Sequence, residues 1–143
     1  MTASTPIKAV LTEDQQALLE ELKACNLFGE DRNGIPLYLN QEESYQLFMK
    51  ELSDIGCTDV KTYNDWNRGC WPGDIEQAGA KFAEEWADSC GDTPDTWLLY
   101  LPKSSWIELN IDWNASWDNI SSEYCCIEMK GIYGLETYIF CVP

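Results

Sequence analysis

The spacing of apolar residues predicts three helices in the first two thirds of the chain. Apolar side chains recur every three or four positions over residues 13–25, 40–56 and 75–90, as on one face of a helix. Gly56 ends the second stretch and Gly91 follows the third, where a glycine commonly ends a helix. Each stretch opens on a side chain that caps helix N-termini: Thr12, Asn40 and Asp74.

Alternation of apolar and polar residues predicts short strands, most of them near the C-terminus. The expected strands are residues 35–39, 59–63, 96–101, 105–113, 122–130 and 135–142. Residues 64–73 are expected to form an irregular loop, and "NASWDN" and "GIYG" to connect the last three strands. Short strands with turn-length links favour an antiparallel meander. The predicted fold class is therefore α+β: an antiparallel sheet, with a C-terminal meander and about three helices packed on one face.

The length of the chain indicates one domain. At 143 residues it has a common single-domain size, so we expect one domain over residues 1–143, with residues 1–11 loosely ordered. Seven cysteines are an odd number, and the N-terminus lacks the long apolar core of a signal peptide. No stretch approaches the length of a membrane span. These features favour free thiols and a cytoplasmic protein, of the host cell if a phage or plasmid encodes it.

The charge balance restricts the partners of this chain. It carries 25 Asp and Glu against nine Lys and Arg, a net charge of −16, and no histidine. Such a charge disfavours direct binding to nucleic-acid phosphates and to anionic membranes. A basic protein partner, a cation or a need for solubility would each explain the excess of acids.

The residue types present exclude several kinds of chemistry. Without histidine, hydrolases that use an imidazole base and zinc sites that contain histidine are excluded. Cys70, in "GCW", therefore lacks a histidine to activate it and is interpreted as structural. The sequence also has no C-x-x-C pair, glycine-rich phosphate loop or EF-hand loop. It predicts no metal site, no cofactor and no enzymatic activity.

The acids near the C-terminus suggest a binding surface. In a strand over residues 105–113, Ile107 and Leu109 would face the core, while Trp106, Glu108 and Asp112 would face water. Alternate residues on one strand face lie about 6.5–7 Å apart, a length scale comparable to the spacing of phosphates. We therefore expect such a row to bind a cationic cleft.

Other candidate contact residues surround this row. Asp118 and Glu123 would extend it, and one face of the third helix carries a second group of acids. Two tryptophans in the predicted loop would be further anchors. The full set of predicted partner-binding residues is Trp106, Glu108, Asp112, Asp118, Glu123, Glu84, Glu85, Asp88, Trp66 and Trp71.

Size, charge and the lack of catalytic motifs together favour a protein that acts by stoichiometric binding. In composition, though in no sequence motif, the chain is similar to the acidic anti-CRISPR and anti-restriction proteins of phages and plasmids. This predicts an inhibitor of a basic nucleic-acid-handling protein, such as a nuclease or CRISPR-type effector, in the manner of a nucleic-acid mimic.

Three alternatives stay open at this point. One is an immunity-type protein that neutralises a cationic toxin, which also requires a basic partner. Another is a small carboxylate-dependent hydrolase, with Glu108, Asp112 and Glu123 beside Trp106. The third is a regulatory scaffold whose acidity has no function beyond solubility.

Overall fold

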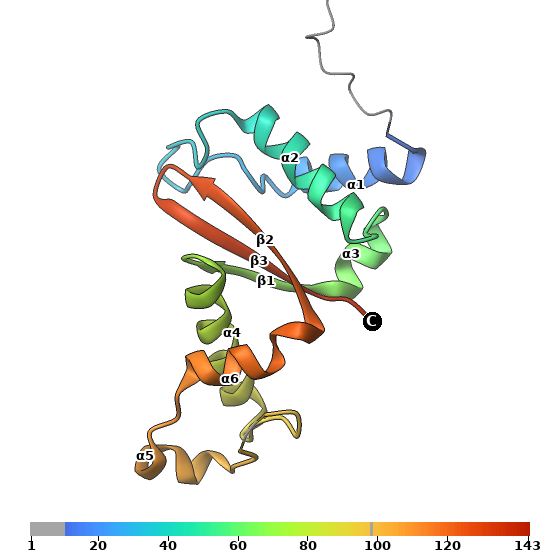
Figure 1. Cartoon of the computed structure of the whole chain (residues 1–143). Coiled ribbons are helices and arrows are strands. Elements are labelled where there is room, and N and C mark those ends of the chain that lie inside the picture. The colour runs from blue at the N-terminus through green and yellow to red at the C-terminus, as the bar shows by residue number, and fades with distance from the viewer. Residues whose placement is uncertain (1–10, 98) are drawn as a thin grey trace, which may run out of the picture.

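A three-stranded antiparallel sheet lies in the middle of the molecule and carries helices on both faces (Figure 1). The computed structural model describes residues 11–97 and 99–143, so the N-terminal segment expected to be loose lies largely outside the described residues. The elements are α1 (Glu13–Ala24), α2 (Gln41–Asp54), α3 (Val60–Trp66), β1 (Asn67–Pro72), α4 (Ile75–Cys90), the 3-10 helix η1 (Lys103–Ser105), α5 (Trp106–Leu109), α6 (Trp113–Ile120), the 3-10 helix η2 (Ser121–Glu123), β2 (Tyr124–Gly131) and β3 (Gly134–Cys141).

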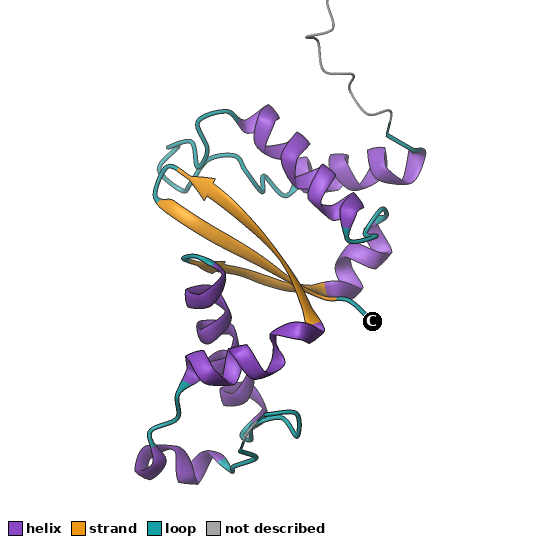
Figure 2. Cartoon of the chain, viewed as in Figure 1, coloured by secondary structure: helices purple, strands orange, loops and turns teal. Residues whose placement is uncertain are grey.

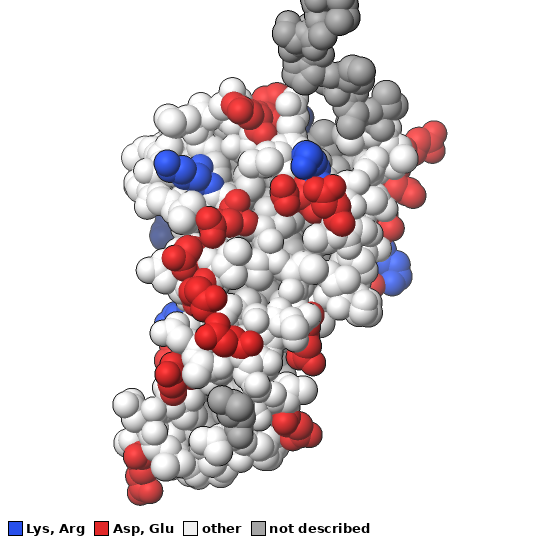
Figure 3. Space-filling model, viewed as in Figure 1, with Lys and Arg blue, Asp and Glu red and all other residues white. Residues whose placement is uncertain are grey.

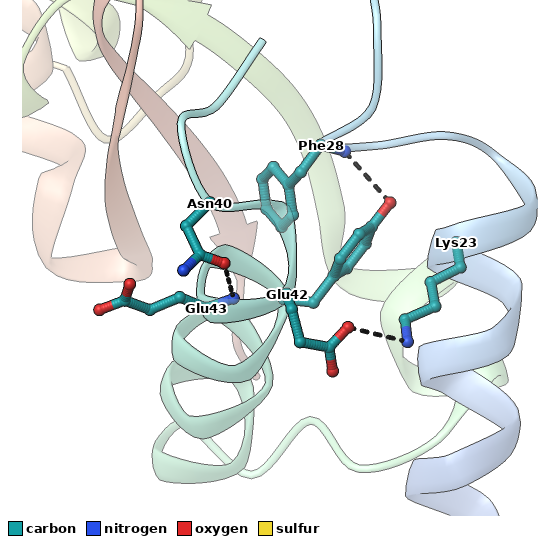
Figure 4. Close-up of polar contacts among 6 residues, drawn as sticks. Lys23, Phe28, Asn40, Glu42 and Glu43 are labelled. Atoms are coloured by element: carbon teal, nitrogen blue, oxygen red, sulfur yellow. Dashed lines mark hydrogen bonds and ion pairs between the residues drawn. The ribbon is translucent and has the colours of Figure 1, made fainter. Parts of the chain in front are cut away.

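The three helices predicted from apolar spacing are confirmed as α1, α2 and α4. Thr12 accepts a hydrogen bond from the Gln15 backbone N–H, and Asp74 does the same for Gln77. Figure 4 shows Asn40 capping α2 in this way, and Lys23 of α1 reaching Glu42 at the start of α2. The Thr12, Asn40 and Asp74 side chains thus satisfy backbone donors that the first helical turn leaves without partners.

The last two predicted strands are confirmed as the hairpin β2–β3, which turns between Gly131 and Gly134. β3 is the central strand, because β1 pairs with its other edge. Its side chains therefore alternate between two covered faces. Tyr138 and Phe140 face α1–α3, and Ile139 between them faces α4 and α6. The predicted α+β class with an antiparallel sheet is confirmed. The prediction of about three helices on one face is wrong, because the described residues form six α-helices and these cover both faces of the sheet.

Two segments in the middle of the chain also differ from prediction. Residues 59–63, predicted as a strand, mostly belong to α3, because Asp59 accepts a hydrogen bond from the Thr62 N–H and starts a helix. The predicted loop 64–73 contains β1, whose Cys70 pairs with Tyr138 of β3. A local helix cap decided the first outcome, and a strand partner distant in sequence decided the second.

Three further predicted strands are absent from the described residues. Residues 35–39 form a loop that is held by a hydrogen bond from the Leu37 N–H to the Gly29 carbonyl. Of residues 96–101, residue 98 lies outside the described residues, and the other five are turn or loop. Residues 105–113 form the end of η1, α5 and the start of α6, which also contains the predicted turn "NASWDN". Asp112 starts α6 by accepting from the Ala115 N–H, which a strand would not allow.

The two faces of the sheet hold two separate cores. The Phe28 core lies between the sheet and α1–α3, and the Phe28 ring meets four other aromatic rings at centroid distances of 4.7 to 6.0 Å. The Trp117 core lies between the sheet, α4 and α6, and contains Phe82, Trp97, Ile120 and Ile139. In the described part of the chain, no helix combines the length and the apolar character needed to cross a membrane.

Candidate functional site

The segment between α4 and α6 projects away from the sheet (Figures 1 and 2). We call it the distal lobe: residues 91–97 and 99–112. Its backbone is organised by Thr93, whose hydroxyl donates to the Leu99 carbonyl and accepts from the Leu101 N–H, both at 2.7 Å. The Lys103 N–H donates to the Gly91 carbonyl and holds the end of the loop against the end of α4. Part-buried hydrogen bonds, rather than a regular sheet, thus hold this part of the molecule together.

A groove of about 480 Å³ lies between α4 and the distal lobe. One wall carries the carboxylates of Glu84, Glu85 and Asp88, and the opposite wall carries Trp106 and its neighbours. The groove thus brings together four of the predicted partner-binding residues, although Trp106 lies about twenty positions after the three acids in sequence. The remaining lining residues are Ile107, Asn110, Ile111 and Trp113.

Four tryptophans hold this groove in shape. The Trp106 and Trp113 rings meet edge to face with centroids 5.4 Å apart, and Trp113 meets Trp97 in the same way at 5.7 Å. Trp86 of α4 completes the series, 6.3 Å from Trp97. The Trp106 indole N–H donates to the Leu101 carbonyl at 3.3 Å. Such edge-to-face pairs add stability beyond burial, so the indole wall of the groove is held firmly.

The carboxylates of the groove have lysines close by. The Lys81 Nζ lies 3.6 Å from Glu84 and 3.7 Å from Glu85, and the Lys103 Nζ lies 2.6 Å from Asp88. All of these side chains are about half exposed to water, so each pair contributes little to stability and exchanges readily. Three carboxylates against two lysines leave the groove with an excess of negative charge.

A second depression of about 190 Å³ adjoins the groove at Asn110 and Ile111, which line both. Its walls include Leu99 and Leu109, together with Asp112 at the start of α6. Leu99 and Leu109 line the second depression, Ile107 lines the groove, and Tyr100 follows Leu99 in the chain. We call these four large exposed side chains the apolar patch: Leu99, Tyr100, Ile107 and Leu109. Ile107 is 93% exposed and Leu99 63%, so the predicted inward direction of Ile107 and Leu109 is wrong.

The sequence analysis missed this patch because the strand it assumed would have buried those side chains. The available signal was Asp112, which stands three residues before Ala115 in the position of a helix cap. A helix that starts at residue 113 interrupts the strand, and Ile107 and Leu109 then have no sheet to join. Glu108 accordingly lies on the short helix α5 rather than in an acidic row on a strand.

Asp118 contributes to a different acidic feature, where α4 and α6 approach β2. Its carboxyl raises the pKa of Glu76, first by a hydrogen bond between the two side chains, with desolvation and the charges of Asp118 and Asp74 adding to it. Glu128 of β2 accepts from the Ile75 N–H at 3.3 Å. We call these four acids the acidic seam: Asp74, Glu76, Asp118 and Glu128.

Three other predicted contact residues lie outside both features. Glu123 is exposed in η2, just before β2. Trp66 packs against the Phe28 core at the end of α3. Trp71 of β1 packs against Phe82 with ring centroids 5.8 Å apart, and its indole N–H donates to a backbone carbonyl. The structure thus does not bring these three residues to the groove.

The carboxylates considered for hydrolysis do not converge as a set. Asp112 precedes α6 and Glu123 follows it, so the eight-residue helix keeps their backbones apart. An α-helix of that length rises about 12 Å, so the backbones of these two residues are well separated. Among residues 11–97 and 99–143, no group of three or more Cys, Asp or Glu side chains is arranged to hold a metal ion.

Cys70 belongs to a polar cluster that the sequence did not indicate. Its thiol lies 3.4 Å from the Glu136 carboxylate, which also accepts from the Tyr38 hydroxyl at 3.2 Å. Desolvation, followed by the charge of Glu136, raises the pKa of Cys70 to about 12. The thiol therefore stays protonated and is a poor nucleophile, in agreement with a structural role.

Comparisons of the chain with models of protein families, with curated proteins and with solved structures found no match.

Proposed function

We propose that this protein acts by stoichiometric binding to a basic, nucleic-acid-handling protein, and that its fixed carboxylates occupy a cationic cleft that otherwise holds a nucleic acid. A nuclease or CRISPR-type effector has such a cleft. The proposal is supported by where the carboxylates lie and by how few of them have a positively charged neighbour.

Most of the carboxylates have no lysine or arginine in ion-pair contact among residues 11–97 and 99–143. Six of the 25 form ion pairs, all with lysines, and the other nineteen have no ion-pair partner among the described residues. On the face shown in Figure 3, acidic side chains follow one another in a diagonal band, and basic side chains are few. Charges of one sign gathered on one face steer an oppositely charged partner over distances of about a Debye length.

The observation that carries the proposal is the acidic seam. A need for solubility would be met by acids spread apart, which repel one another less. Instead, Glu76 and Asp118 come from two helices and lie close enough to share a hydrogen bond, which raises the pKa of Glu76. Asp74 and Glu128 also accept hydrogen bonds at the N-terminus of α4, which stabilises the helix. The Glu76–Asp118 pair has no such role, and the repulsion within it destabilises the folded state, so retaining this pair favours a role in binding.

The test is competition with nucleic acid. The purified protein is titrated into complexes of labelled DNA or RNA with a panel of basic nucleases, CRISPR-type effectors and nuclease toxins, and fluorescence anisotropy is followed. We expect release of the nucleic acid at a one-to-one ratio from at least one panel member, and weaker binding as salt rises. A toxin as the responding member would point to an immunity-type protein, and no response from any member at low salt would contradict the proposal.

Charge variants connect the effect to the seam. The triple variant Glu76→Gln, Asp118→Asn, Glu128→Gln is compared with a matched control on α1, Asp14→Asn, Glu20→Gln, Glu21→Gln, which removes the same charge from another exposed surface. We expect the seam variant to slow association about tenfold or more and the control to have a much smaller effect. Equal effects would assign the binding to net charge alone.

A further inference from the structure

We propose that the apolar patch and the adjoining groove form a docking surface for a partner segment in which arginine and large apolar side chains lie next to each other. This rests on the proposed function for the basic character of the partner. It adds the place of the contact and the residue types that make it. The acidic seam would attract the partner, and the distal lobe would anchor it.

Exposure of the patch is the first argument. Ile107, Leu109, Leu99 and Tyr100 lie within eleven positions of the chain, and all are more than half exposed. Ile107, Leu99 and Leu109 line two depressions that share Asn110 and Ile111, and Tyr100 follows Leu99 in the chain, so these side chains are grouped rather than scattered. Exposed apolar surface of this kind, bordered by polar residues, is typical of protein interaction sites.

The rigidity of the surface beneath the patch is the second argument. The Trp106, Trp113 and Trp97 rings pack edge to face, and Thr93 holds the loop backbone with two short hydrogen bonds. A surface that is already ordered loses little conformational entropy when a partner binds. The backbone that carries the exposed side chains is therefore held by ring packing and hydrogen bonds.

Charge decides against a second copy of this chain as the occupant. The adjoining groove is lined by Glu84, Glu85 and Asp88, Glu108 stands between Ile107 and Leu109 on α5, and the whole chain carries a net charge of −16. A symmetric dimer through this surface would place the acids of the two copies against each other, which like-charge repulsion opposes. A basic partner has the complementary charge.

The two walls of the groove favour arginine over lysine. A planar guanidinium can lie against an indole face of Trp106 or Trp113 and still donate hydrogen bonds to a carboxylate on the opposite wall. Lysine carries a compact, strongly hydrated charge and makes this double contact less well. The weak, exposed pairs of Lys81 and Lys103 with the groove acids are readily exchanged for the incoming guanidinium.

The test uses three octapeptides and the full chain. One peptide alternates arginine and leucine, the second replaces arginine by lysine, and the third replaces leucine by serine. Binding is measured by calorimetry and tryptophan fluorescence at 150 and 500 mM NaCl. We expect the arginine–leucine peptide to bind about tenfold more tightly than either of the others and to retain part of its affinity at high salt. Equal binding of the lysine peptide would overturn the assignment to arginine, and equal binding of the serine peptide would overturn the role of the patch.

Two double variants locate the contact. Ile107→Ser with Leu109→Ser removes apolar side chains from the patch, and Leu39→Ser with Leu47→Ser removes exposed leucines elsewhere; Leu39 is 97% exposed. We expect the patch variant to lose about tenfold in affinity for the arginine–leucine peptide and the control variant to bind like the parent. Circular dichroism verifies that both remain folded. Loss in both variants, or in neither, would overturn the proposal.

A final comparison separates this inference from the proposed function. With a nuclease from the competition panel, loss of binding in the seam variant but not in the patch variant would overturn the docking surface alone. Loss in neither variant would contradict both. Sedimentation of the parent and the patch variant tests whether a second copy of this chain occupies the patch. A dimer of the parent that Ile107→Ser with Leu109→Ser abolishes would assign the patch to self-association and overturn the proposal.

Discussion

The Phe28 core and the distal lobe are both rich in aromatic rings, yet only the core encloses its apolar side chains. Phe28, Phe48 and Phe140 are fully buried between three helices and the sheet. The four tryptophans around the lobe also pack ring against ring, but Ile107 and Leu99 remain open to water beside them. The difference shows that edge-to-face packing of aromatic rings can hold a segment in shape, while covering the apolar side chains around it requires a second layer of helices or strands.

The reason for this difference is the size and regularity of the elements. The sheet gives the Phe28 core a broad apolar face, and α1 and α2, of 12 and 14 residues, cover it. The distal lobe has only η1, of three residues, and α5, of four. Helices this short present less than two turns and cannot cover their neighbours. The apolar side chains left over are the ones that we assign to a partner.

The largest effect is expected from a substitution within the Phe28 core. Replacing Phe28 by alanine removes a ring that contacts Tyr38, Tyr45, Phe48 and Tyr138, and we expect a loss of about 3–5 kcal/mol in the free energy of unfolding. Urea denaturation followed by circular dichroism measures it. Phe28→Leu, which keeps more of the volume, should lose less and stay folded. A loss below 1 kcal/mol for Phe28→Ala would mean that this core is not closely packed.

A smaller effect is expected where α4 crosses α6 in the Trp117 core. Gly79 lies against the Trp117 indole, and a methyl group at this position would overlap the ring. We expect Gly79→Ala to cost about 1–3 kcal/mol, although alanine is the better helix former. Thermal unfolding provides the measurement, with Ser89→Ala on the exposed face of α4 as control. The cost should shrink in a Trp117→Phe background, and an unchanged cost there would place the strain elsewhere.

The acidic seam should give a modest effect that depends on pH. Because the folded state raises the pKa of Glu76 above its usual value near 4.5, native Glu76 holds its proton more tightly than the unfolded chain does. Stability from this group is therefore present below about pH 4.5 and is lost as the pH rises through the folded pKa. We expect Asp118→Asn to raise the melting temperature at pH 7 and to have little effect at pH 3.5.

The control for this prediction is Glu123→Gln, which removes an exposed acid that does not belong to the acidic seam. Its effect on the melting temperature should not grow with pH in the same way. An Asp118→Asn effect that is equal at pH 3.5 and pH 7 would indicate a change in helix packing rather than relief of repulsion.

The smallest expected effect sharpens the contrast with Phe28. Ile107 is nearly as exposed as a side chain can be, so Ile107→Ser should change the free energy of unfolding by no more than about 0.5 kcal/mol. Leu39→Ser, at another highly exposed leucine, is the matched case. A loss above 1 kcal/mol for Ile107→Ser would show that the apolar patch contributes to the fold and is not left free for a partner.

The elements that sequence reasoning found correctly are those whose signals are local. Thr12, Asn40 and Asp74 each cap the backbone N–H three residues on, so the starts of α1, α2 and α4 need no distant partner. The hairpin β2–β3 turns within a few residues at Gly134, whose φ of 123° suits glycine. The signals for these elements therefore come from residues a few positions apart in sequence.

The presence or absence of a strand partner distant in sequence decided several of the misassigned segments. β1 exists because Cys70 and Trp71 pair with β3, more than sixty positions later. The segment over residues 105–113 alternates like a strand but has no neighbouring strand to join, so its capping signal at Asp112 prevails. Short alternating segments fit either state, and tertiary partners choose between them.

The candidate site was predicted in parts. Glu84, Glu85 and Asp88 share the exposed face of a confirmed helix, so their proximity follows from helical spacing. That Trp106 would lie opposite them does not follow from any local pattern, because the distal lobe folds back along α4. The seam formed by Glu76 and Asp118 depends in the same way on how α4 and α6 cross.

The sequence by itself determined the charge of this protein, its three main helices and its hairpin, since each of these follows from composition or from neighbours a few residues away. The tertiary structure alone decided which acids meet, which lysines approach them and which apolar side chains remain uncovered. The physical reason is that burial and charge proximity are properties of surfaces in contact, and the surfaces here come from segments far apart in the chain.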